Sequence, residues 1–367
     1  MLCVFSLALP AAILPFREPM LRLFGASDAT YPYAEAYFTL YLLGTPFALL
    51  ASGLNQFIVC QGFAADGMKS VALGAVLNIV LDPVFIFAFG LGVRGAAIAT
   101  VLSQLASCVY AVRFLLGKKP PIRITRGGYS AAVMRRVLTL GFSPFIIIAL
   151  DNVMIIAMNA VLQHYGGAAR GDALVTCATI VQSYLLLITM PMGGLTLGSQ
   201  PVVSFNYGAA NLERIKRAIQ SIVALCVTFC VLMTVVTHTL SPVFVGLFTQ
   251  NPEVAARSVR YIKVFTAMII PLAIQYPLVD ETTALGHVRL ALFCSIFRKC
   301  VFLAGLLLLP ALVSPEATFL SEPIADAVAA TVTTCLFLHF FPKILAQRAA
   351  REREEREERE EQPKVAP

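Results

Sequence analysis

The sequence contains little charge for its length. Of its 367 residues, only 13% are Asp, Glu, Lys or Arg, whereas 58% are hydrophobic, and the mean hydropathy is +0.79. A soluble domain of this length carries about twice that charged fraction. The composition therefore excludes an ordinary soluble globular protein and predicts a chain that lies largely within a lipid bilayer.

The sequence also lacks the residue patterns of metal sites and of intramembrane enzymes. No Cys-x-x-Cys pair occurs among its nine cysteines, its four histidines lie far apart, and no span carries paired aspartate motifs or a Ser/His dyad. We expect no enzymatic activity and no resident metal or cofactor. The net charge of +7 does not indicate nucleic-acid binding, because basic residues in membrane proteins mark cytoplasmic loops.

Long apolar runs take up most of the chain. Runs of about 20 apolar residues match the hydrocarbon core of a bilayer, and the absence of period-2 alternation argues against barrel strands. We predict an all-α polytopic membrane protein with a partial helix in the opening run and nine full transmembrane helices. Those nine spans are predicted at 33–60, 70–91, 94–117, 137–163, 173–202, 215–240, 258–285, 289–313 and 322–342.

The orientation follows from the longest basic loop. Residues 117–136 contain six basic residues and no acidic one, so the positive-inside rule places this loop in the cytoplasm. Alternate crossing of the membrane then predicts that the charged C-terminal tail is cytoplasmic as well.

The two halves of the chain share landmarks at a spacing of 224 residues, and transporters are often built from repeated halves. The paired landmarks are Leu23-Phe24 with Leu247-Phe248, Tyr37 with Tyr261, and Gly62 with Gly286. We therefore divide the chain into the remnant of an N-terminal lobe at 1–117, a basic cytoplasmic linker at 118–136, a C-terminal lobe at 137–342 and a charged tail at 343–367.

Two stretches carry a family resemblance, GFAADGMKSVALGAVLNIVLDPVFIFAFGLGVRGAAIATVLSQ at 62–104 and PMGGLTLGSQPVVSFNYGAANLERIKRA at 191–218. Together with LFGASDATYPYAEAYF they resemble the bacterial branch of the multidrug and toxic compound extrusion (MATE) family. The resemblance implies two six-helix lobes around a central cavity. It also implies antiport across the bacterial cytoplasmic membrane, in which cationic or amphipathic organic compounds leave in exchange for Na⁺ or H⁺. We expect a monomer.

The opening run predicts a helix that begins partway along its length. No Lys or Arg precedes Arg17, so the positive region of a signal peptide is missing. The repeat spacing places Met1 opposite the middle of the span 215–240, and the resemblance implies a complete first lobe. We therefore expect an N-terminally truncated chain that inserts into the membrane but does not transport.

Ionisable residues inside spans are functional candidates by default. Asp151, followed by Asn152, lies mid-span among apolar residues. We expect Asp151 to couple a cation or proton. The alternative is a hydrogen-bonded structural group, with Arg298 as a candidate partner. Asp280 and Glu281 are candidates for the cavity of the C-terminal lobe, although simple hydration near the cytoplasmic end would also explain them.

The remaining charged residues are not expected to bind the coupling ion. Asp82 belongs to the motif LDP and is expected to be structural, while Asp326, shortly after Pro323, is expected to cap a helix. Arg298 and Lys299 are expected to satisfy carboxylates or to line the transport path. A more basic cavity would favour the alternative function of flipping a lipid-linked precursor, and a non-functional fragment is the other alternative.

Overall fold

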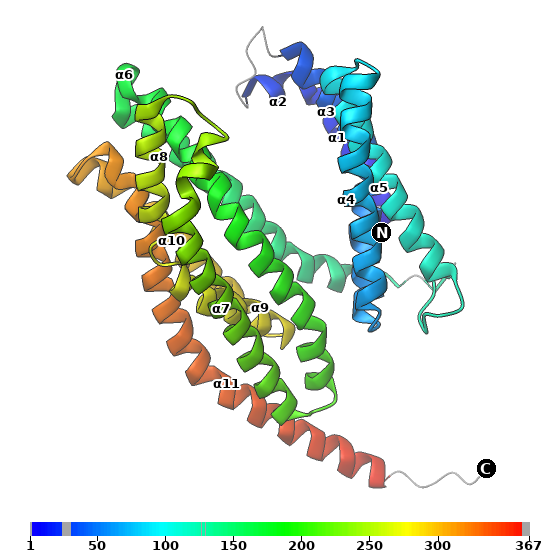
Figure 1. Ribbon diagram of the computed structural model, residues 1–367. Coiled ribbons are helices and arrows are strands. Elements are labelled where there is room, and N and C mark those ends of the chain that lie inside the picture. Colours follow the sequence, from blue (N-terminus) through cyan, green and yellow to red (C-terminus); the bar gives the residue numbers. More distant parts are fainter. Residues whose placement is uncertain (1, 24–30, 126, 129, 362–367) are drawn as a thin grey trace. The chain divides into compact units, whose positions relative to one another are not determined.

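The computed structural model describes residues 2–23, 31–125, 127–128 and 130–361, and in these residues it contains helices and no strand. The chain forms two compact units, Met1–Met134 (unit 1) and Arg135–Pro367 (unit 2). The predicted all-helical membrane fold is confirmed. Figure 1 shows the helices of each unit, coloured from blue at the N-terminus to red at the C-terminus.

Unit 1 is built from long apolar helices joined by short turns. Pro83 ends α4, and the chain continues directly in a π-helical turn before a glycine-containing bend starts the next span. The elements are α1 (Leu2–Ile13), η1 (Leu14–Phe16), α2 (Arg17–Leu23), α3 (Tyr31–Cys60), α4 (Ala64–Pro83), η2 (Val84–Ala88) and α5 (Gly92–Leu116).

The opening segment is longer than its apolar run. The apolar run ends at Phe16, whereas the helical segment continues through Arg17 and Glu18 to Leu23. The charge of Arg17 does not end the helix because its Nε donates to Glu35 of α3 at 2.8 Å. Residues Leu2–Arg22 are consequently long and apolar enough to count as a candidate span.

Unit 2 contains the longer set of helices. Its first helix, α6, consists of two spans, Ala131–Gly167 and Arg170–Gly208, which meet at Gly167 with φ +62°. The elements are α6 (Ala131–Gly208), α7 (Leu212–Gly246), α8 (Pro252–Phe265), α9 (Ile269–Ala284), α10 (Val288–Leu312), η3 (Pro315–Leu320) and α11 (Ser321–Glu361).

Nine helices in the described part of the chain could cross a membrane, and α8 with α9 would make a tenth. Eight of the nine predicted full spans are found as single helices. The predicted span 258–285 is instead broken between α8 and α9, whose axes differ by 53°. Pro271 lies in the first turn of α9, where its missing N–H group leaves no hydrogen bond unmade.

The predicted repeat is visible in the helix boundaries. The spans Ala64–Ala88 and Val288–Leu312 correspond at a spacing of 224 residues at both ends (288 − 64 and 312 − 88). Gly62 and Gly286 precede them with φ of +89° and +82°. Equivalent backbone hydrogen bonds close both turns, Phe63 to Ile58 and His287 to Thr282, as in a Schellman motif. Phe24, part of another landmark, lies outside the described residues.

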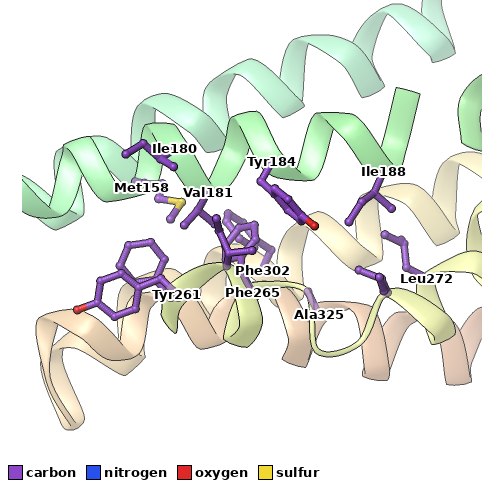
Figure 2. Close-up of a cluster of buried hydrophobic side chains, with 14 of the residues drawn as sticks. Met158, Ile180, Val181, Tyr184, Ile188, Tyr261, Phe265, Leu272, Phe302 and Ala325 are labelled. Carbon is purple, nitrogen blue, oxygen red and sulfur yellow. The ribbon is translucent and has the colours of Figure 1, made fainter. Parts of the chain in front are cut away.

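The largest apolar core lies within unit 2. Figure 2 shows its central side chains, which come from both halves of α6, from α8 and α9, and from α10 and α11. The ring of Tyr261 in α8 stacks on Phe319 of η3 with centroids 4.1 Å apart. Tyr184 in α6 packs edge-on against Phe244 in α7, and its hydroxyl lies 3.0 Å from that of Thr237. This packing holds the helices that carry the charged residues described next.

Candidate functional site: buried charges of unit 2

Two consecutive basic residues lie at the middle of α10 and face different neighbours. Arg298 and Lys299 are near the centre of the span Val288–Leu312. Successive side chains on an α-helix are about 100° apart around its axis. Arg298 is accordingly directed to α11, while Lys299 is directed to the first span of α6. Each therefore contacts its own set of carboxylates.

Arg298 holds two carboxylates of α11. Its Nε and Nη2 lie 2.9 and 2.8 Å from Oδ1 of Asp326, and Nη2 also pairs with Oε1 of Glu322. The Asp326 side chain has no exposed surface, and that of Glu322 is 9% exposed. Because a buried carboxylate without a cation is costly, both acids of α11 depend on Arg298 of α10 for compensation of their charge.

This arrangement corrects the interpretation of Asp326 as a helix cap. The turn before α11 is already formed by η3, and α11 begins at Ser321. Asp326 therefore lies beyond the first turn, where the backbone N–H groups are bonded within the helix. Its role in the structure is to bind Arg298.

Lys299 pairs with Asp151, so the alternative pairing of Asp151 with Arg298 is wrong. The Lys299 ammonium contacts Oδ1 of Asp151. Asp151 lies near the middle of the span Ala131–Gly167, as the sequence predicts. The two side chains differ in accessibility, because Lys299 is 8% exposed and Asp151 is 54% exposed. The carboxylate is thus the more exposed member of the pair.

The second pair of acidic candidates lies on α9 against the second span of α6. Glu281 is fully buried, and its Oε1 accepts a hydrogen bond from the Ser199 hydroxyl. No described group bonds its Oε2. Asp280 is half-buried and lies near the Thr196 hydroxyl, which donates to the Gly193 carbonyl at 3.1 Å. Burial of Glu281 argues against simple hydration as the reason for that residue.

Tyr276 also lies on α9, one turn before Asp280. Its hydroxyl lies over Gly193 of α6, at 3.3 Å from where a Cβ would be. Next to the acidic pair, α9 is thus in contact with the second span of α6.

The other two candidates make local contacts. Asn152 donates one amide N–H to the Ile148 carbonyl of its own helix at 2.9 Å. Asp82 in unit 1 accepts from Asn78 at 3.3 Å, and Asn78 also reaches Thr100 of α5 at 3.4 Å. These bonds are consistent with a structural Asp82.

Sequence reasoning did not select Glu322, Ser199, Thr196 or Tyr276. Glu322 was detectable, because it is an acid at the start of a span and precedes Asp326 by one helical turn. The hydroxyl groups carried no comparable signal, since Ser and Thr are common in membrane helices and commonly bond their own backbone.

A multi-span helical bundle with charge-paired acids at mid-membrane depth is typical of membrane transporters. Comparison with known proteins agrees with this class. The family model MatE matches residues 1–84 and 145–308, which is more than half of the chain. The chain belongs to the MatE family of multidrug efflux transporters.

Curated relatives include the multidrug export protein MepA of Staphylococcus haemolyticus, which is 26% identical over 344 residues covering 92% of this chain and 73% of that protein. MepA of Staphylococcus aureus (strain NCTC 8325 / PS 47) is 25% identical over 320 residues, covering 86% and 69%. These relatives are bacterial exporters, and the chain is accordingly a multi-pass protein of the cell membrane.

Solved structures show the same fold. A MATE transporter in its bent conformation aligns with a TM-score of 0.84 at 20% identity, covering 95% of this chain and 78% of that one. A MOP superfamily transporter from Pyrococcus furiosus, described as having a binding pocket of reverse polarity, aligns with a TM-score of 0.85 at 21% identity, covering 94% and 77%.

Proposed function

We propose that this protein exports organic cations and amphipathic drugs in exchange for Na⁺ or H⁺, and that the acids of unit 2 bind the exchanging cations. This proposal replaces the expectation from the sequence that the chain inserts without transporting, and the experiment below decides between the two. The observation that carries the proposal is the Asp151 carboxylate, which lies mid-span and half-exposed beside a buried ammonium. A carboxylate in this position can bind a proton, a Na⁺ ion or an organic cation in turn, and mutual exclusion of these cations couples their movements.

The charge balance of the site supports cations as cargo. Arg298 and Lys299 are matched by three carboxylates, those of Asp151, Glu322 and Asp326. Asp280 and Glu281 have no ion-pair partner among the described residues. The acids thus outnumber the basic groups, whereas flipping of an anionic lipid-linked precursor would call for a surplus of basic groups.

The relatives support drugs as the substrate class, because MepA is named a multidrug export protein. We further propose that the protein acts as a monomer and that the basic loop 118–136 and the C-terminal tail face the cytoplasm, as the positive-inside rule predicts.

Transport by purified protein in proteoliposomes tests the proposal. Vesicles containing the full chain receive a Na⁺ or a proton gradient, and the movement of the fluorescent cation ethidium is followed. We expect movement that depends on one of the two gradients and that is lost in Asp151→Asn, which removes the charge and keeps the shape. Asp82→Asn is the matched control, because it makes the same chemical change in unit 1, and it should retain transport.

The alternatives predict other results. Undiminished, gradient-dependent ethidium transport by Asp151→Asn would remove Asp151 from the mechanism. Movement of a fluorescent anionic phospholipid between leaflets, without ethidium transport, would favour lipid flipping. A folded protein that moves neither substrate under either gradient would favour the non-functional fragment.

A further inference from the structure

We propose that Lys299 is a tethered cation that occupies Asp151 in the cation-free protein, so that an organic cation or coupling ion binds there only by displacing the ammonium group. This inference rests on the proposed function, because it concerns how the same carboxylate is controlled. It assigns Lys299 the role of a positioning residue that sets the affinity and charge selectivity of the site.

The first support is the asymmetry of the ion pair. The Lys299 side chain is almost completely buried, whereas more than half of the Asp151 side chain is accessible. A cation can therefore approach the carboxylate from its open side while the ammonium stays inside the protein. Exchange of partners at Asp151 does not require α10 to move away from α6.

The second support is the division of carboxylates along α10. Arg298 already holds Glu322 and Asp326, so Asp151 is the only carboxylate paired with Lys299 among the described residues. Displacement of Lys299 therefore frees Asp151 without disturbing the pairs that Arg298 makes with α11.

The third support is the chemistry of lysine. Its ammonium is a compact charge on a flexible four-carbon stem and can withdraw, whereas the planar guanidinium of arginine binds a carboxylate through two parallel hydrogen bonds. A lysine therefore keeps the mid-span carboxylate of Asp151 compensated when no substrate is bound and yields it to a competing cation. This predicts opposite effects for two substitutions at one position.

The test measures equilibrium binding of radiolabelled tetraphenylphosphonium to the purified full chain in lipid nanodiscs, without Na⁺ and at fixed pH. Lys299→Gln should bind this cation at least about tenfold more tightly than the wild type, a change of about 1.4 kcal/mol. Lys299→Arg should bind it more weakly than the wild type. Asp151→Asn should lose binding, both alone and combined with Lys299→Gln.

The outcomes separate this inference from the proposed function. If Asp151→Asn loses binding while Lys299→Gln binds no more tightly than the wild type, the cation site stands and the tethered cation is wrong. If the double variant binds as well as Lys299→Gln, Asp151 is not the cation site, and both proposals fail at this residue.

A measurement on the unaltered protein covers the case in which Lys299→Gln does not fold. Displacement of the ammonium should change how fast the Lys299 amine is acetylated, as followed by mass spectrometry with and without tetraphenylphosphonium. We expect faster acetylation with the cation bound, because the freed ammonium can lose its proton more readily than a paired one. An unchanged rate at saturating cation would overturn the proposal.

Discussion

Removal of Arg298 should destabilise unit 2 more than any other single change in the charged cluster. Arg298→Met keeps most of the apolar stem and deletes the guanidinium. It leaves Asp326, which has no exposed surface, and Glu322, which is 9% exposed, one helical turn apart on α11 without a cation. Breaking a buried ion pair by removing one partner costs about 3–5 kcal/mol.

The size of the effect can be stated as a melting temperature. Unit 2 spans Arg135–Pro367, and for folded units of comparable size a loss of 1 kcal/mol lowers Tm by roughly 2–4 °C. Arg298→Met should therefore lower Tm by about 6 °C or more. The triple variant Arg298→Met, Glu322→Gln, Asp326→Asn removes all three charges together and should recover most of the loss, because replacing a whole buried ion cluster is often close to neutral.

Buried cysteines provide the assay. The chain has no tryptophan, but Cys226, Cys230 and Cys294 are free and buried, so a thiol-reactive dye reports their exposure on heating. Cys294 lies one turn before Arg298 on α10 and reports on the affected helix directly. A Tm of Arg298→Met within about 2 °C of the wild type, or a triple variant as unstable as the single one, would contradict the assigned contacts.

Two further predictions concern the repeat and the topology. Gly62→Ala and Gly286→Ala should each destabilise the protein by about 1 kcal/mol, because both turns require positive φ. The control variant Gly246→Ala should not destabilise it, because Gly246 lies in a helix with open space at its Cβ position. Equal melting temperatures for all three variants would argue against equivalent turns. Cysteines introduced at Lys118 or Lys119 should resist membrane-impermeant thiol reagents in intact cells and react after permeabilisation, and labelling from outside would reverse the proposed orientation.

The helices were largely predictable because each depends on local sequence. Long apolar runs must be helical in a bilayer, and Gly62 and Gly286 mark turns that only a few residue types can adopt. The break between α8 and α9 was not predictable in this way. It falls at Thr266, Ala267 and Met268, which include neither glycine nor proline, and Pro271 lies after the bend.

The sequence pointed to most acids of the charged clusters but not to Glu322, and it did not determine their partners. Arg298 and Lys299 are adjacent, so a small rotation of α10 would exchange which neighbour each one faces. Only the packed helices determine that Arg298 contacts α11 and Lys299 contacts α6. The cap assigned to Asp326 failed for a similar reason. The start of α11 at Ser321 is close to the predicted one, but Asp326 lies in the second turn, and only the packing of α10 against α11 gives it Arg298 as a partner.

Ion uptake driven by exit of an organic cation is the measurement that tests cation exchange most directly. Proteoliposomes are loaded with tetraphenylphosphonium and diluted into medium without it, with Na⁺ and pH equal on both sides and the membrane potential clamped. Exchange predicts that exit of the organic cation drives Na⁺ or protons inward, although neither ion has an initial gradient. Asp151→Asn should abolish this inward movement. Exit of tetraphenylphosphonium through the wild-type protein with no inward movement of either ion would contradict the proposed antiport.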